Sequence, residues 1–337
     1  MRSGSGRRVV SGILSVLALA GLLRLMIASA ETAPTLATVL VTGVQPGPGL
    51  WKVSNGEHVL WILGTLRPLP QKMSWRSKEV EAVVAQSQEV LGLSRATLGL
   101  NLFSSLPELA AWRRIKRLPD GQRLADVLSP DTFARWSSSK RLFLGADDDV
   151  ERLRPRYAAA TLYDAALDHA GLTDAYDIWD VVKRVARKHR VRIVTNDFKI
   201  QVDDPRTRIE ALEHAPPDAD AACMDATLNR LQEDLQNMGL RANAWATGDI
   251  ETLRKLPYVE QESACLESIG NIEGLAGSVQ ELRTRLARDW IRSARTALDE
   301  NRSSVALLPI DEMFSKTGRL AQLRDMGYLV EEPNDAL

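Results

Sequence analysis

The hydrophobic pattern of the chain first becomes regular near residue 50, where apolar and polar positions alternate as they do in β-strands. Asn55-Gly56 separates two such runs and is a typical turn dipeptide, so this segment predicts a β-hairpin. The second strand ends at Gly64-Thr65, and Arg67 follows. Because ligands of α/β sheets usually bind at the carboxyl ends of strands, Gly64, Thr65 and Arg67 are candidate binding residues. The alternating apolar positions are Trp51, Val53, Val59, Trp61 and Leu63.

Helical periodicity replaces the alternation after the hairpin. A helix is predicted from about residue 75 to 86 with Ser74 as its cap, and residues 89–93 are predicted to form a short buried strand. A strand, a crossover helix and a second strand favour parallel pairing with a right-handed connection. Residues from about 96 to 190 are then predicted to be a large helical insertion, followed by a sheet strand at residues 191–195.

The rest of the chain is predicted to be mainly helical around one more sheet strand. A long helix includes residues 224–238, after which Gly239 can end it, and another helix spans about 279–300. The expected fold is α/β, with a central mixed or parallel sheet opened by the β-hairpin, a large helical insertion and flanking helices. The remaining predicted elements are a strand at 304–309, a loop beginning at Met313-Phe314, a helix opened by Gly318 and an edge segment at Leu329-Val330.

The N-terminus has the pattern of a secretory signal peptide. Three arginines precede an apolar run from residue 9 to 23, and Ala28-Ser29-Ala30 supplies small residues for cleavage after Ala30. Residues 1–30 are predicted to be a signal peptide and residues 31–48 a flexible leader. The apolar run is shorter than the ~20 residues of a membrane span, although an uncleaved anchor stays open as an alternative. We expect a periplasmic or secreted protein, attached to a membrane only if this segment is retained.

Composition and charge are those of an ordinary globular protein. The chain has 337 residues, of which 45% are hydrophobic and 26% charged, and its formal net charge is −1. Loss of residues 1–30 removes four arginines and no acid, which leaves −5 and argues against nucleic acid as a partner. Cys223 and Cys265 are predicted to form a disulfide in an oxidising compartment, with two separate buried thiols as the alternative.

Two longer segments carry a recognisable order of motifs. The first, within residues 50–93, reads LWKVSNGEHVLWILGTLRPLPQKMSWRSKEVEAVVAQSQEVL, and the second covers residues 281–332. Together they resemble the TraB/GumN family, the group that includes the TIKI metalloproteases, so one domain of this type is expected over residues 49–333. The resemblance implies that two histidines and a glutamate converge from strand ends to hold a divalent metal for hydrolysis.

The chain departs from this family pattern at all three metal-ligand positions. Arg67 stands where the first histidine is expected, Gly92 where the glutamate is expected, and Asp311 or Glu312 where the second histidine is expected. Arginine has no lone pair to offer a metal, so we predict no metal and no other cofactor. One hypothesis is that Arg67 forms an ion pair with Asp311 or Glu312 in place of the metal, and the other is that these side chains face water.

Two classes of function follow from these departures. The first is a non-catalytic binding or scaffold protein of the cell envelope, with an unknown protein or small-molecule partner and Arg288 as a further binding residue, since the family has an arginine-containing segment there. The alternative is a hydrolase or protease that uses Arg67, Asp311 and Glu312 with or without a divalent metal. No histidine follows a predicted strand, and no Gly-x-Ser-x-Gly, P-loop or His-Glu-x-x-His motif supports other chemistry. An accessory role in envelope polysaccharide rests only on the name GumN.

Overall fold

The structure, a computed structural model, describes residues 39–93, 96–98, 114–175, 178–200, 210, 212–216, 218, 220–258, 265 and 276–333. All of them belong to the second of the two units into which the chain divides, Thr38–Leu337. The predicted signal peptide, residues 1–30, and residues 31–38 of the predicted leader lie outside the described residues. The signal peptide therefore stays a prediction.

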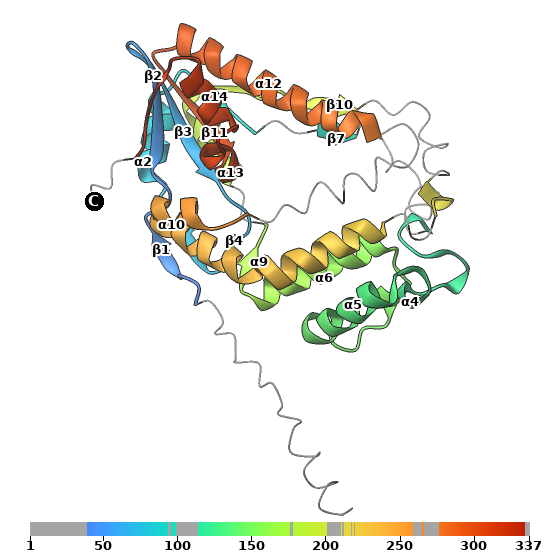
Figure 1. Ribbon diagram of the computed structural model, residues 1–337. Helices are drawn as coiled ribbons and strands as arrows, with labels where there is room; N and C mark the ends of the chain where they lie inside the picture. Colours follow the sequence, from blue (N-terminus) through green and yellow to red (C-terminus); the bar gives the residue numbers. More distant parts are fainter. Residues whose placement is uncertain are drawn as a thin grey trace, which may run out of the picture. The chain divides into compact units, whose positions relative to one another are not determined.

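A six-stranded mixed sheet lies at the left of Figure 1, and its strands are in the order β12-β2-β3-β11-β6-β9. The predicted hairpin is confirmed, because β2 pairs antiparallel with β3 around the turn at residues 56–57. Strands β3, β11, β6 and β9 run parallel, and β12 pairs antiparallel with β2 at the edge. The bounds are β2 Leu50–Asn55, β3 His58–Thr65, β6 Glu89–Leu91, β9 Arg192–Val194, β11 Ser303–Pro309 and β12 Leu329–Glu331.

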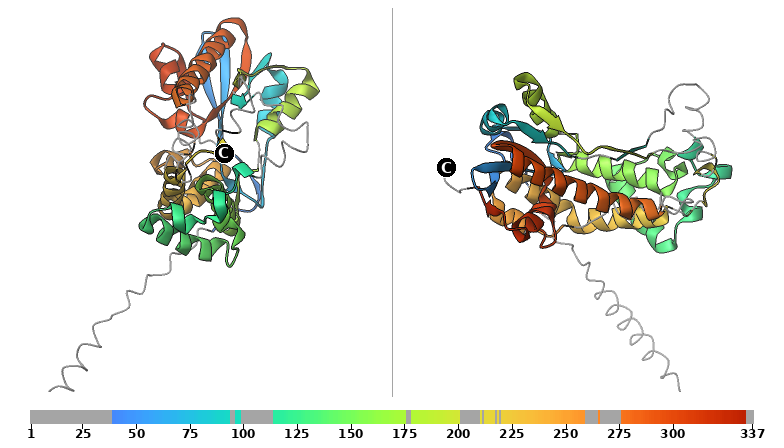
Figure 2. Two further views of the ribbon diagram at one scale, coloured as in Figure 1. Left: turned by 90° about the vertical axis from the view of Figure 1, so that its right-hand side faces the viewer. Right: turned by 90° about the horizontal axis from the view of Figure 1, so that it is seen from above.

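Helices cover both faces of the sheet, which explains why its central strands are apolar throughout. Strand β11 is buried over five successive residues, 304–308, as expected for a parallel strand between two helical layers. In Figure 2 (left), α12 and α14 lie on one face, and α2 and α7 lie on the other. The bounds are α2 Lys78–Gln86, α7 Ile178–His189, α12 Ala276–Glu300 and α14 Arg319–Asp325. The α/β fold predicted from the sequence is thus confirmed.

A second hydrophobic core lies among the helices of the predicted insertion and α9. It surrounds Trp136, which is fully buried and whose indole N–H donates to Glu151 at 3.1 Å. Helices α6 and α9 lie side by side in Figure 1, and the C-terminal part of α9 reaches the sheet core through Met238 and Trp245. The bounds are α4 Leu124–Val127, α5 Pro130–Phe143, α6 Pro155–His169, α9 Ala221–Thr247 and α10 Ile250–Lys255, with single 3₁₀ turns at Pro119–Gly121 and Asp149–Arg152.

Three two-stranded pairs were not predicted from the sequence. β1 (Gly43–Gln45) pairs with β5 (Met73–Trp75), so part of the predicted leader is a strand. The first helix therefore begins at Lys78 rather than at residue 75. The other two pairs join β4 (Leu69–Pro70) with β8 (Leu172–Thr173), and β7 (Ala96–Leu98) with β10 (Phe198–Ile200). Strands of two or three residues carry too little periodic signal to be recognised.

Two predicted boundaries near the site are wrong. Helix α9 continues through Gly239, which is buried inside it, and ends at Gly248, whose φ of 77° is the left-handed conformation that glycine adopts at helix ends. Met313-Phe314 belongs to the short helix α13 (Ile310–Phe314) rather than to a loop. The other predicted starts are confirmed, since Gly318 is the N-cap of α14 and Leu329 begins the edge strand.

Candidate functional site

The carboxyl ends of the parallel strands meet at one edge of the sheet. Thr65 at the end of β3 lies opposite Pro309 at the end of β11, and Leu91 of β6 lies opposite Ala306. Gly92, which follows β6, donates its backbone N–H to Val194 of β9 at 2.9 Å. The topology therefore brings the sequence-predicted positions at residues 67, 92 and 311–312 to the same edge, as the sequence suggested.

Gly64 is required for packing at the end of β3. A Cβ at this position would lie 2.6 Å from Ile310 Cδ1 and 3.0 Å from Met313 Sδ, so α13 sits directly on the glycine. On the other side, the buried Trp245 donates its indole N–H to the Gly64 carbonyl oxygen at 2.9 Å. The Gly-Thr step thus has a structural role in holding α13 and α9 against the strand end.

Arg67 is exposed and lies beside the β4–β8 pair. Leu69 lies opposite Thr173 in that antiparallel pair, so Asp174 continues alongside Pro68 and close to Arg67. Burial raises the pKa of Asp174, while the positive charges of Arg230 and Arg67 lower it. The charge of Arg67 therefore acts on an acid of the β8 turn.

Glu312, the second acid after β11, has a partner on α14. Glu312 accepts a hydrogen bond from the backbone N–H of Arg319 at 3.1 Å, and its carboxylate lies 3.4 Å from the Arg319 guanidinium. Within the part of the chain that the structure describes, Glu312 forms an ion pair with Arg319. No ion pair there joins Arg67 to Asp311 or to Glu312. The hypothesis of an ion pair in place of the metal is therefore not supported by the geometry.

Gly92 has no room for a side chain. A Cβ there would lie 2.4 Å and 2.5 Å from two ring carbons of Trp179 and 2.9 Å from Thr195 Cγ2. Trp179 belongs to α7, is 4% exposed and packs in the core of the sheet. An indole ring therefore occupies the space into which any side chain at position 92 would extend. Trp179 carries no signal of this role in the sequence, because it is one apolar residue among several on an amphipathic helix.

We expect Gly92→Ala to destabilise the fold by about 1–3 kcal/mol, the usual range for overpacking a filled core. The tryptophan ring is rigid and enclosed, so it cannot move away at low cost. Urea unfolding of four proteins measures this effect: wild type, Gly92→Ala, Trp179→Leu and the double variant. The Gly92→Ala cost should largely disappear when residue 179 is leucine, and an equal cost in both backgrounds would contradict the contact.

A cavity of about 450 Å³ opens next to the β11 strand end. Its walls come from α10 and the residues after it, and from α13 and the turn to α14. Leu253 and Phe314 are among its apolar lining residues, and Arg254, Asp311 and Glu312 supply charge. Arg254 is already paired with Glu332 at 2.6 Å and lies over the Phe314 ring at 5.5 Å. Both candidate acids therefore line a site that a small ligand or a partner side chain could enter.

Asp311 is the carboxylate of this cavity with a raised pKa. Desolvation by the surrounding protein is the largest cause, and the neighbouring Glu312 carboxylate adds to it, while Arg319 opposes both. The folded state therefore favours protonated Asp311 more than the unfolded state does. The ionised carboxylate weakens the fold at neutral pH, and this penalty disappears as the pH falls below the unfolded pKa.

Asp311→Asn should accordingly raise the melting temperature at pH 7 and have no such effect near about pH 3. Asp249 provides the control, because hydrogen bonds from Thr252 lower its pKa. Its ionised form stabilises the fold above the unfolded pKa, and this contribution is lost as the pH falls through the folded pKa. Asp249→Asn should thus lower the melting temperature at pH 7. Thermal scans across this pH range test both signs, and a loss for Asp311→Asn at pH 7 would contradict the assignment.

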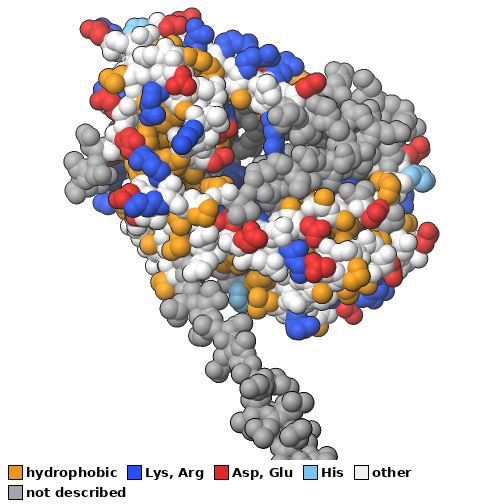
Figure 3. Space-filling model, viewed as in Figure 1, with side chains coloured by type: hydrophobic (Ala, Val, Ile, Leu, Met, Phe, Trp, Pro, Cys, Tyr) orange, Lys and Arg blue, Asp and Glu red, His pale blue; other side chains and the backbone are white. Residues whose placement is uncertain are grey.

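Arg288 belongs to the charged outer surface of α12. It is exposed on α12 and lies 3.8 Å from Asp289, which also pairs with Arg285 and Arg292. Figure 3 shows basic side chains along this part of the surface with acidic ones between them. This arrangement is that of a solvated helix face on which arginines and acids neutralise one another.

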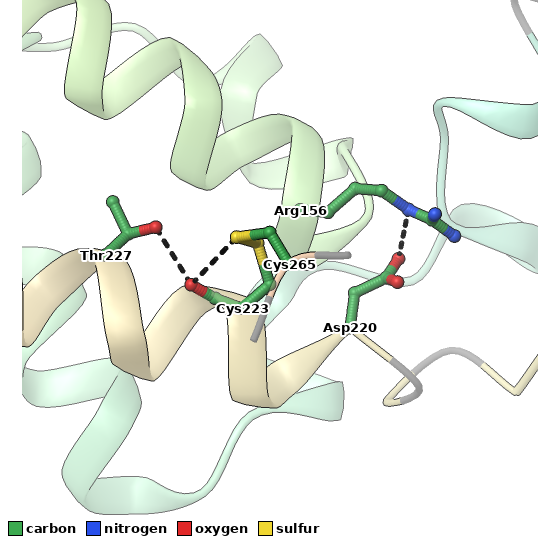
Figure 4. Close-up of a disulfide and its surroundings, with 5 residues drawn as sticks. All are labelled: Arg156, Asp220, Cys223, Thr227 and Cys265. Carbon is green, nitrogen blue, oxygen red and sulfur yellow. Dashed lines mark hydrogen bonds and ion pairs between the residues drawn. A yellow bond between two sulfur atoms is a disulfide. The ribbon is translucent and has the colours of Figure 1, made fainter. Parts of the chain in front are cut away.

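The predicted disulfide between Cys223 and Cys265 is present (Figure 4), with an S–S distance of 2.02 Å. Cys223 lies near the start of α9, and its carbonyl oxygen accepts a hydrogen bond from the Thr227 hydroxyl at 2.8 Å. One turn earlier, the buried Asp220 carboxylate accepts a hydrogen bond from Arg156 at 2.9 Å. The disulfide belongs to the second hydrophobic core and not to the cavity.

Two further findings concern only the part of the chain that the structure describes. It contains no group of three or more His, Cys, Asp and Glu side chains arranged to hold a metal ion. None of its helices combines the length and the apolar character needed to cross a membrane.

Comparison with known proteins identifies one family. The model of the TraB/PrgY/gumN family matches residues 49–332. No curated protein matches the chain, and no solved structure matches it. The match begins at the hairpin and ends after the edge strand, so it includes all six strands of the sheet. Because it spans well over half of the sequence, the chain belongs to the TraB/PrgY/gumN family.

Proposed function

We propose that this chain is an exported member of its family that has lost the metal-dependent hydrolase site and acts as a non-catalytic binding or scaffold protein of the cell envelope. The packing at Gly92 is the observation that carries the proposal. Trp179 and Thr195 fill the space that a glutamate side chain would need at the end of β6. A metal ligand cannot be restored there without displacing a buried tryptophan, so the change extends beyond a single substitution.

The other two ligand positions also do not fit a divalent metal. Arg67 offers a permanent cation without a lone pair, and such a group repels a metal ion. Asp311 and Glu312 are suitable donors by chemistry, but Glu312 is bound by Arg319. One free carboxylate and one arginine do not form a site for a catalytic metal, which normally has three protein ligands. No catalytic step is therefore assigned to a metal here.

The cavity beside Asp311 is the binding site of this proposal. Its lining mixes apolar side chains with charged and hydroxyl-bearing ones in similar measure, so a polar ligand or a polar side chain of a partner suits it better than an apolar one. Tyr258, at its rim, has a pKa raised to about 12 by burial, although the nearby Arg241 opposes the shift. This tyrosine stays protonated at physiological pH and can donate a hydrogen bond from its hydroxyl to a ligand.

The envelope location rests on the sequence and on one structural feature. The N-terminal segment has the basic, apolar and small-residue regions of an export signal. A disulfide is typical of proteins that fold outside the reducing cytosol. The alternative hydrolase based on Arg67, Asp311 and Glu312 has less support, because Arg67 lies beside Asp174 and Glu312 is engaged by Arg319.

Elemental analysis of the purified protein after incubation with manganese, cobalt and zinc tests the loss of the site. We expect well below one metal ion per chain, unchanged in the variant Asp311→Ala/Glu312→Ala. One bound metal ion per chain in the wild type, lost in that variant, would overturn the proposal and revive the hydrolase. Melting curves of both proteins show that the variant is folded, so that a negative result is interpretable.

A further inference from the structure

The end of α7 and the turn that follows it carry a concentrated positive charge. Residues 183–192 read KRVARKHRVR and contain six lysines or arginines and one histidine, in a chain whose formal net charge is only −1. Cations near a helix C-terminus complement its dipole, but one or two suffice for that effect. The number of charges here exceeds what the stability of the helix requires. We call residues 183–192 the α7 basic segment.

Acids neutralise only the two ends of this segment. Lys183 pairs with Asp180 at 2.5 Å, and Arg192 pairs with the buried Glu89. The four cations between them are exposed and form no ion pair with any described residue. The acids of the neighbouring helix α2 lie in its first turn, away from its C-terminal end. The four exposed cations are Arg184, Arg187, Lys188 and Arg190.

Arg190 has a backbone conformation that usually belongs to glycine. Its φ is +58°, and the Val191 N–H closes the helix end by donating to the Ala186 carbonyl oxygen at 2.8 Å. Glycine is the common residue at such a helix end, because any Cβ is unfavourable in the left-handed region. The chain thus places an arginine where glycine would be less strained. The stability of the helix end does not explain the arginine at this position, whereas a function of its charge at the surface does explain it.

The α7 basic segment lies at the opposite edge of the sheet from the candidate site. Helices α7 and α2 lead directly into the parallel strands β9 and β6, so both helices end near the amino ends of these strands. The cavity and the candidate acids lie at the carboxyl ends. A partner bound to the α7 basic segment would therefore leave the cavity accessible.

The residue types of the α7 basic segment favour a phosphate-bearing membrane surface over a protein as its partner. Large hydrophobic side chains are exposed at several described positions of the molecule, but none of these lies between residues 178 and 192. Stable protein interfaces have an apolar or aromatic centre, whereas attraction to lipid headgroups needs only accumulated charge. The predicted export signal would also bring the chain to a membrane. We propose that the α7 basic segment binds the anionic headgroups of a lipid bilayer, so that the protein attaches peripherally to a membrane surface.

Vesicle co-sedimentation of the full-length chain tests this proposal. The two lipid compositions are phosphatidylcholine alone and phosphatidylcholine with about 30 mol% phosphatidylglycerol. The test variant is Arg184→Gln/Arg187→Gln/Lys188→Gln/Arg190→Asn, in which asparagine tolerates the left-handed conformation. The control variant, Lys72→Gln/Lys78→Gln/Lys316→Gln/Arg324→Gln, removes the same charge at four other exposed positions. The N-terminal segment is identical in all three proteins, so its own affinity for vesicles cancels.

We expect the test variant to bind anionic vesicles on the order of 100-fold more weakly than the wild type, and the control variant to lose less than about tenfold. Wild-type binding to these vesicles should also fall as salt is raised from about 0.05 to 0.5 M. Equal losses in both variants, or no preference for anionic vesicles, would overturn the proposal. Retained binding to an RNA duplex or to an acidic polysaccharide, without binding to vesicles, would assign the segment to another polyanion and overturn it too.

Discussion

Asp234→Ala is expected to lower the free energy of unfolding by about 3–5 kcal/mol, since it would leave a buried arginine without its counter-charge. Asp234 and Arg241 are 0% and 2% exposed, and their side chains form two hydrogen bonds of 2.8 and 2.5 Å. Arg241 also donates to the carbonyl oxygen of Pro257 and lies 4.4 Å from the centre of the Tyr258 ring. The pair therefore connects the middle of α9 to the rim of the cavity.

Chemical denaturation of Asp234→Ala, Arg241→Met and the double variant Asp234→Leu/Arg241→Met measures this effect. The double variant should be more stable than Asp234→Ala, because it removes both charges and retains apolar volume. Loosening of residues 257–258 should accompany the loss, which the fluorescence of Tyr258 or hydrogen exchange at these residues can follow. A cost below about 1 kcal/mol for Asp234→Ala would mean that water reaches Arg241 and that the pair is not buried as described.

Loss of the Cys223–Cys265 disulfide should destabilise the protein by about 4 kcal/mol in the chain-entropy model, for a sequence separation of 42. The cross-link restricts the unfolded chain over α9 from Cys223 onward and over the whole of α10. Cys223 is 2% exposed and packs in the second hydrophobic core, so both residues should be replaced by alanine to keep the site apolar.

Reduction provides the matched control for this prediction. Wild-type protein treated with a phosphine reductant should unfold at the same denaturant concentration as Cys223→Ala/Cys265→Ala, and the reductant should not affect the variant. If reduction changes the stability by less than about 1 kcal/mol, the unfolded chain gains no freedom when the bond is broken. In that case the disulfide would have no role in an exported, oxidised protein beyond packing.

The proposed function depends on geometry that no single motif contains. The residue types at the three strand ends are visible in the sequence, and they already argue against a metal. A neighbouring side chain could still bind the metal in place of a substituted ligand, however. At the end of β6, only the packing around Gly92 argues against such a replacement. The cavity is similarly invisible in the sequence, because α10 and α13 are about 55 residues apart along the chain.

Several elements could be predicted because their signals are local. The hairpin was predicted from Asn55-Gly56, and the observed two-residue turn, at residues 56–57, lies one position further along. The amphipathic period of α12 marks that helix to within three residues of its observed start. The predicted end of α9 at Gly239 is too early, because a glycine inside a helix and a glycine at a helix end cannot be told apart in the sequence.

The sequence by itself determined the α/β class, the hairpin and the family, because these follow from side-chain types and short-range periodicity. It also shows an arginine at position 67 and a glycine at position 92, neither of which offers a metal a side-chain ligand. The tertiary structure alone decided that Trp179 covers Gly92, that Arg319 rather than Arg67 binds Glu312, and that a cavity opens beside Asp311. Gly92 and Trp179 are distant along the chain, as are the α10 and α13 walls of the cavity, so only the assembled layers bring them together. Pairing of that kind depends on the packing of whole layers, for which no short stretch of sequence carries the information.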